Sequence, residues 1–290
     1  MKLRLSIIAL ALLASACTHT PDGAPAEKAA AQSIAPCSTT TSEKAPTPLL
    51  YSARLRDEQN MRCLLDAGAD VNATDSKGRT ALLFAVDDCS HHIHKHQVTA
   101  ATRLLLERGA NPNAADHKGD TALMHAARLN CFDTARLLID KGADLNAANH
   151  DGLTALMHAI DLGNTETVRF LVEQGADVNA ANDTGYTALM HTVAGGHWIR
   201  HTKEDGHKRL VAAARLLLEN GANPNATAEG GITALMIAAH DGNTDTARLL
   251  IEHGADVNAA TKDGKTALSF AKENDHTDIV QMLKAAGAKE

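Results

Sequence analysis

The sequence predicts an all-α protein: one elongated array of short, stacked helices. Three observations support this. A Thr position and a Gly position each recur seven times, and the spacing from Gly109 to Gly142 and from Gly142 to Gly175 is 33 residues. Each copy holds two helical patterns too short to be stable alone. Aromatic residues are only 2% of the chain, so the core must be built from small aliphatic side chains.

The clearest copy is the segment 154–179. Thr154 is a good helix N-cap, because its hydroxyl can accept a hydrogen bond from a free backbone N–H. Apolar residues then recur at helical spacing until Gly163, restart at Val168, and stop at Gly175, where a positive φ is favoured. The seven Thr positions are Thr47, Thr80, Thr121, Thr154, Thr187, Thr233 and Thr266.

Residues 1–16 are predicted to be a signal peptide. Lys2 and Arg4 precede a short apolar run, and residues 14–16 read Ala-Ser-Ala, an A-x-A cleavage pattern. The apolar run is too short to span a membrane as a helix. We therefore expect an exported bacterial protein located in the periplasm.

Cys17 follows the predicted cleavage site directly. This segment resembles the lipobox of bacterial lipoproteins, in which the Cys is diacylated and becomes the new N-terminus. The resemblance implies anchoring to the outer membrane through Cys17. Ala14 stands where lipoproteins usually have Leu, so ordinary cleavage at the same bond is the alternative. Residues 17–44, rich in Ala, Pro, Ser and Thr, are predicted to form a flexible tether.

The repeated residues resemble the ankyrin repeat closely over residues 45–288. Six units carry Thr-Ala-Leu, the first carries Thr47-Pro48-Leu49, and units close with Gly-Ala and then Asn. The resemblance implies a solenoid of helix–turn–helix units joined by β-hairpin-like loops, with a concave face that binds a partner protein. The expected units are about 45–77, 78–118, 119–151, 152–184, 185–230, 231–263 and 264–288.

Histidines recur where the concave face is expected. His125, His158 and His191 occupy one register in three successive units, and His117 and His150 lie on expected loop tips. Because neighbouring helices lie about 10 Å apart, the three successive histidines are poorly placed to share one metal ion. We interpret these five residues, with Trp198, as partner-binding candidates. Polar lining without a specific role is the alternative for the histidines, and for Trp198 it is a tucked residue that pins its loop.

Two insertions interrupt the 33-residue period, each between the two helices of a unit. The first contains His91, His92, His94 and His96, and the second contains His197 and His201. His92 with His96, and His197 with His201, have the i, i+4 spacing that can hold a metal ion on one helix face. A Zn or Cu site is therefore one hypothesis, and solvated loops that shape a partner site are the other.

Cys37, Cys63, Cys89 and Cys131 remain beside Cys17. Four cysteines in an oxidising compartment allow three pairings. Cys89 and Cys131 occupy nearly the same loop position in adjacent units, which favours pairing them. Cys37 would then join the N-terminal arm to Cys63. A buried free thiol at Cys63 is the alternative.

No catalytic constellation is evident: the chain lacks Gly-x-Ser-x-Gly, a phosphate-binding loop and His-Glu-x-x-His. A net charge of −7 and the lack of a basic stripe argue against nucleic acid as a partner. We therefore expect a monomeric, non-catalytic protein-binding scaffold without a cofactor. A periplasmic metal-binding or metal-sensing protein is the second hypothesis, and an enzyme with an unfamiliar site is the third.

Overall fold

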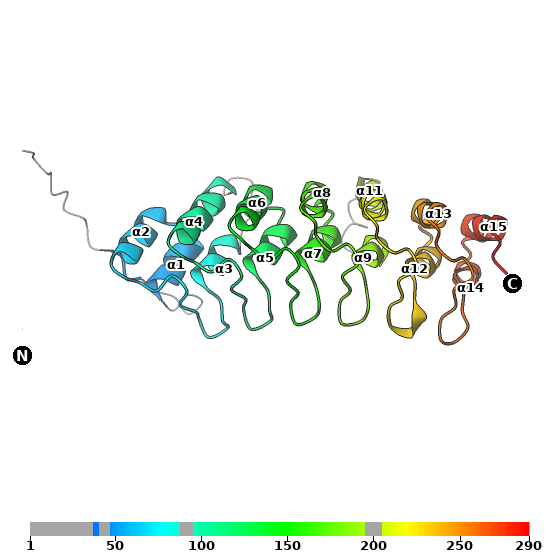
Figure 1. The fold of residues 1–290 in the computed structure, drawn as a ribbon, viewed down its shortest axis with the longest axis horizontal. Coiled ribbons are helices and arrows are strands. Elements are labelled where there is room, and N and C mark those ends of the chain that lie inside the picture. The colour runs from blue at the N-terminus through cyan, green and yellow to red at the C-terminus, as the bar shows by residue number, and fades with distance from the viewer. Residues whose placement is uncertain (1–36, 41–46, 88–94, 195–204, 290) are drawn as a thin grey trace, which may run out of the picture. The chain divides into compact units, whose positions relative to one another are not determined.

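The computed structural model describes residues 37–40, 47–87, 95–194 and 205–289, all of which belong to one compact region, Cys37–Glu290. These segments contain fourteen α-helices arranged in seven pairs, and no strand, which confirms the predicted all-α solenoid. Figure 1 shows the pairs side by side in chain order, with first helices in one layer, second helices in another and loops projecting from one edge. No helix in the described segments is both long and apolar enough to cross a membrane.

The first helices of the seven units are α1 (Pro48–Leu55), α3 (Ala81–Val86), α5 (Ala122–Arg128), α7 (Ala155–Asp161), α9 (Ala188–Ala194), α12 (Ala234–Asp241) and α14 (Ala267–Glu273). Every one of them begins directly after one of the seven recurring threonines. In α7, the Thr154 hydroxyl accepts a hydrogen bond from the backbone N–H of Met157 at 3.4 Å. The same bond occurs at the other six threonines at 3.3–3.4 Å. The predicted N-caps are therefore present in every unit.

The second helices are α2 (Glu58–Asp66), α4 (Lys95–Glu107), α6 (Phe132–Asp140), α8 (Thr165–Glu173), α11 (Asp205–Glu219), α13 (Thr244–Glu252) and α15 (Thr277–Ala285). Five of them have 9 residues, whereas α4 has 13 and α11 has 15. These two long helices directly follow the two insertions. Part of each insertion therefore adds residues to the start of the second helix and does not belong to the loop.

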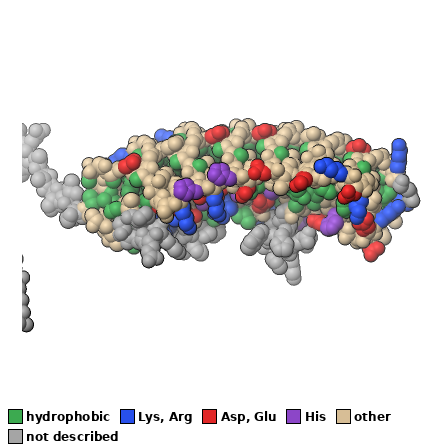
Figure 2. All heavy atoms as spheres, turned by 90° about the horizontal axis from the view of Figure 1, so that it is seen from below, with side chains coloured by type: hydrophobic (Ala, Val, Ile, Leu, Met, Phe, Trp, Pro, Cys, Tyr) green, Lys and Arg blue, Asp and Glu red, His purple; other side chains and the backbone are tan. Residues whose placement is uncertain are grey.

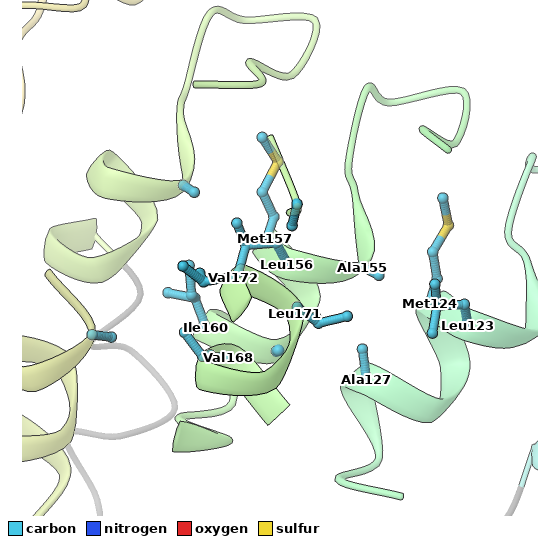
Figure 3. Close-up of a cluster of buried hydrophobic side chains, with 14 of the residues drawn as sticks. Leu123, Met124, Ala127, Ala155, Leu156, Met157, Ile160, Val168, Leu171 and Val172 are labelled. Atoms are coloured by element: carbon cyan, nitrogen blue, oxygen red, sulfur yellow. The ribbon is translucent and has the colours of Figure 1, made fainter. Parts of the chain in front are cut away.

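The core is a continuous layer between first and second helices (Figure 3). Within one unit, Leu156, Met157 and Ile160 of α7 pack with Val168 and Leu171 of α8, and each is at most 1% exposed. Burying each such side chain contributes about 1.5–3 kcal/mol relative to leaving it in water. Because the same positions are apolar in neighbouring units, each unit completes the core of the next.

One asparagine per unit bonds to the next unit. Asn179 donates from its side-chain amide to the carbonyl of Gly221 at 3.0 Å, and its Oδ1 accepts the backbone N–H of Asn223 at 2.8 Å. The Oδ1 of the equivalent Asn accepts the same backbone bond at five further junctions, at 2.6–2.8 Å; these residues are Asn72, Asn113, Asn146, Asn225 and Asn258. The closing Asn of the sequence pattern is thus the link between units.

The loops are also connected to one another. A single antiparallel bridge joins Ala148 to Thr154, and equivalent bridges occur in four other loops, as expected for hairpin-like loops. The N–H of Asp183 bonds to the carbonyl of Asp151 in the preceding loop at 3.2 Å. Gly152 lies at this contact with φ = 75°, and a Cβ there would meet the Asp183 nitrogen at 2.6 Å, so only Gly fits.

The N-terminal arm contacts the first unit. Cys37 is disulfide-bonded to Cys63 of α2, with a Cα–Cα distance of 5.6 Å, so Cys63 is not a free thiol. The Ser38 N–H donates to the Asn60 side chain at 2.7 Å. Two residues of the predicted tether, Cys37 and Ser38, therefore contact α2. Residues 1–36, with the predicted signal peptide and Cys17, lie outside the described residues, as does Cys89. Cys131 is buried at the start of α6, and its pairing with Cys89 stays a prediction.

We predict that Asn179→Ala lowers the free energy of unfolding by about 1–2 kcal/mol, because two hydrogen bonds between units are lost. Urea unfolding followed by circular dichroism measures the change. Asn220→Ala is the control, because the Asn220 amide bonds only within its own helix end, to the Leu216 carbonyl. An equal decrease in the free energy of unfolding for the two variants would show that the Asn179 hydrogen bonds between units do not stabilise the array.

Candidate functional site

The register that holds the three histidines runs through all seven units. It is the fourth residue after each recurring Thr, and we call it the first-helix row: Tyr51, Phe84, His125, His158, His191, Ile237 and Phe270. The three residues just before it are Ala-Leu-Met in four units and similar in the others, and all but Pro48 and Ser269 are buried. In the row, every residue except Phe84 is partly buried and still reaches the surface, and the identity changes from unit to unit. Because consecutive first helices are in contact, these side chains form one line along the molecule.

The histidines in the middle of the row contact acidic groups of the preceding unit. His191 Nδ1 lies 2.8 Å from Asp161 Oδ1, and His125 Nδ1 lies 3.5 Å from Asp87 Oδ1. Asp161 ends α7 and Asp87 follows α3, so each pair spans one junction between units. Hydrogen bonding to His125 lowers the pKa of Asp87, although burial opposes the shift.

His158 is in a different environment. Burial lowers its pKa, since the charged ring loses hydration. Asp120 and Asp161 partly offset this effect by favouring the charged form, whereas Arg128 and His125 add to it. At neutral pH His158 therefore presents a neutral ring, which can both donate and accept one hydrogen bond.

The C-terminal part of the row borders an apolar hollow of about 280 Å³. Its lining residues are Tyr186, Ile232, Met236, Ile237, His240, Asp241 and Phe270. Two of them are polar neighbours: His240 Nδ1 lies 2.7 Å from Asp241 Oδ1, and the Asp241 side chain is only 17% exposed. The surface along the row therefore has two parts. Its middle carries histidines paired with carboxylates, and its C-terminal part borders an apolar hollow with the Asp241 carboxylate in its wall.

The loop-tip histidines lie apart from the row. His117 and His150 are exposed, and their backbone N–H groups bond to the carbonyls of Lys77 and Lys118 in the preceding loops, at 2.8 and 2.9 Å. Seen from the loop side, histidine, basic and acidic side chains are mixed along the length of the array (Figure 2). The loop tips could contact a partner beside the row, as a second line of polar groups.

Most of the predicted metal ligands lie outside the described residues: His91, His92, His94, His197 and His201, as does Trp198. His96 lies in the first turns of α4 and is exposed. In the part of the chain that is described, no three His, Cys, Asp or Glu side chains come close enough to hold a metal ion. The Zn or Cu hypothesis therefore stays a prediction.

Sequence reasoning identified three of the seven residues of the row and missed the apolar ones. Ile237 and Phe270 stand in the same register as His191, and Tyr186 and Ile232 stand one residue before the recurring Thr. Aligning the seven units by their threonines shows both positions as varied. The apolar residues at these two varied positions in the last three units are the sequence feature that could have located the hollow.

Comparison with known proteins agrees with the geometry. A model of ankyrin repeats in three copies matches residues 89–149, 144–201 and 204–289, and a model of the single ankyrin repeat matches residues 47–76. The crystal structure of the ankyrin repeat domain of Bcl-3, a unique member of the IkappaB protein family, is 30% identical in sequence. It superposes with a TM-score of 0.66, and the match covers 81% of this chain and 98% of that one. No curated protein matches.

We predict that His158 makes the stability of the protein depend on pH. The folded-state pKa lies below the ordinary value of about 6.5, so the unfolded chain binds a proton first as the pH falls. The contribution of His158 is therefore complete above about pH 6.5 and is lost as the pH falls below it. His158→Gln should reduce the loss of unfolding free energy between pH 7.5 and 5.5, as measured in urea.

The control for this experiment is His150→Gln, because His150 is exposed on a loop tip. This variant measures how much of the effect comes from replacing any histidine with glutamine. An identical pH dependence in the wild type and His158→Gln would contradict the burial of a neutral ring in the row.

Proposed function

The chain belongs to the ankyrin repeat family, whose repeats generally mediate protein–protein interaction without catalysis, and from this premise we propose a scaffold of the bacterial cell envelope. It binds one partner protein through the first-helix row and the loop tips beside it. The chain acts as a monomer and requires no cofactor. Its anchor is the lipidated Cys17, which holds the array near the outer membrane.

The binding role is inferred from one observation: in the first helices, some positions hold the same residue in nearly every unit, whereas the residue at the row position varies. Positions such as Ala155, Leu156 and Met157 are buried and recur because each unit must stack on the next. All residues of the row except Phe84 reach the surface, so stacking imposes fewer limits on their side chains. Side chains that differ from unit to unit on an otherwise uniform surface can provide specificity for one partner.

Two observations support a location outside the cytoplasm. The first is the sequence of residues 1–17, which has the charge, apolar run and Cys of an exported lipoprotein. The second is the disulfide between Cys37 and Cys63, since such bonds persist in oxidising compartments and are rare in the cytosol. This disulfide also joins the tether, at Cys37, to the first unit, so an anchor at Cys17 would hold the array by its N-terminal end.

We predict that a photoreactive p-benzoylphenylalanine at position 158 crosslinks one stoichiometric partner in the envelope of living cells. His158 is half-exposed in the centre of the row, within reach of any protein bound along it. The same residue placed at Arg169 is the control, because Arg169 is exposed on α8, in the layer of second helices. Mass spectrometry of the adducts identifies the partner.

The control position should give no stoichiometric adduct. Absence of an adduct from position 158, or equal yields of one protein from both positions, would contradict binding through the row. An adduct found only in the cytoplasmic fraction would contradict the proposed location.

A further inference from the structure

We propose that the hollow bordered by Tyr186, Ile232, Ile237 and Phe270 receives a large apolar side chain from an extended, basic segment of the partner protein. The inference rests on the proposed function and specifies which chemistry the partner brings to the C-terminal half of the array. It concerns only the last three units, because the hollow is formed by residues of α12, by Phe270 of α14, and by Tyr186 and Ile232, which lie in the loops before α9 and α12.

The walls of the hollow favour an apolar occupant. Five of its seven lining residues are apolar or aromatic: Tyr186, Ile232, Met236, Ile237 and Phe270. All but Met236 are half-exposed, so apolar surface of the array remains in water there. A molecule of liquid water takes up about 30 Å³, so a hollow of about 280 Å³ has room for several waters or one large side chain. Replacing those waters with an apolar group removes apolar surface from water on both sides.

The charges around the hollow favour a basic segment. Asp241 forms part of its wall, and the exposed tips of the loops before α9, α12 and α14 carry Asp183, Glu229, Lys262 and Asp263. Lys265 Nζ lies 5.6 Å from the centre of the Phe270 ring and is paired with the Glu273 carboxylate at 2.7 Å, and a second exposed lysine, Lys272, follows on α14. Acidic groups therefore predominate around an apolar depression. Complementary charge speeds association with a Lys- or Arg-containing segment and disfavours an acidic one.

The geometry of the array favours an extended segment. Neighbouring helices lie about 10 Å apart, and an extended chain advances about 3.3 Å per residue, so roughly every third residue would meet a new unit. A segment lying along the row with its apolar side chain in the hollow would then reach His191, whose Nδ1 is bonded to Asp161. Neighbouring loops are bonded to one another; for example, the Glu229 N–H donates to the Thr184 carbonyl at 2.9 Å. The loop tips therefore form a continuous line parallel to the row, and their acidic side chains would face the basic side chains of the segment.

The test uses an mRNA-display library of random 12-residue peptides, selected on the immobilised full chain with its disulfides intact. We expect enrichment of peptides with Phe, Trp, Tyr or Leu within three residues of Lys or Arg. A fluorescein-labelled peptide of the enriched pattern then measures affinity. Ile237→Asp should weaken its binding by at least about tenfold, because a carboxylate would be buried against the apolar side chain.

A second variant keeps the test independent of the packing of the hollow. Asp183→Lys with Glu229→Lys changes only exposed loop tips, and should weaken binding and reduce its salt dependence. Lys77→Glu is the matched control. Lys77 is an exposed loop tip four units before Glu229, far from the hollow in chain order, and its replacement should have no effect. Circular dichroism confirms that each variant is folded.

Three results would overturn the inference. They are enrichment of acidic or wholly polar peptides, unchanged affinity in Ile237→Asp, and no enrichment at all. Peptides that bind the wild type and Ile237→Asp equally, but lose affinity for His158→Ala, would place the binding in the histidine part of the row. The proposed scaffold function would then stand without the apolar site, and crosslinking from position 158 decides that function separately.

Discussion

The hydrogen bonds of one asparagine side chain per junction set the geometry on which the rest of the structure depends. The amide of Asn179 bonds to a carbonyl and an N–H of the following unit, and the same acceptor bond recurs at every junction. Because these bonds fix the position of each unit on the next, they bring the buried residues of α7 and α8 against their equivalents in adjacent units. No unit is long enough to bury a core alone.

The residues that stack the units differ from those that are free to bind a partner, and this difference indicates where the binding surface lies. The Thr caps, the Ala-Leu-Met positions and the closing Gly and Asn are needed for every unit to form and to stack. The first-helix row is free of most of these constraints, and it differs along the array: histidines paired with Asp87 and Asp161 in the middle, and an apolar hollow near Ile237 and Phe270. A partner would therefore meet two chemically distinct surfaces along one continuous face.

Much of the fold follows from local sequence rules, and much of the site does not. Thr154 as an N-cap and Gly175 as a helix end are readable because each depends on bonds within a few residues. The Asp161–His191 pair and the hollow depend on contacts between units about 30–50 residues apart, which no local pattern encodes. The lengthening of α4 and α11 was missed for a similar reason: a His-rich or charged insertion resembles a loop unless the helix that follows it is known.

The central claim is that stacking and partner binding use separate side chains, and one paired measurement tests it most directly. A variant with His125, His158 and His191 all replaced by Ala is compared with the wild type for urea unfolding and for the amount of partner protein retained in the same preparation. We predict that the free energy of unfolding falls by no more than about 2 kcal/mol, from the loss of the hydrogen bonds of partly buried histidines at the surface of the array, while partner binding is lost. Unfolding of the array, or undiminished retention of the partner, would contradict the claim.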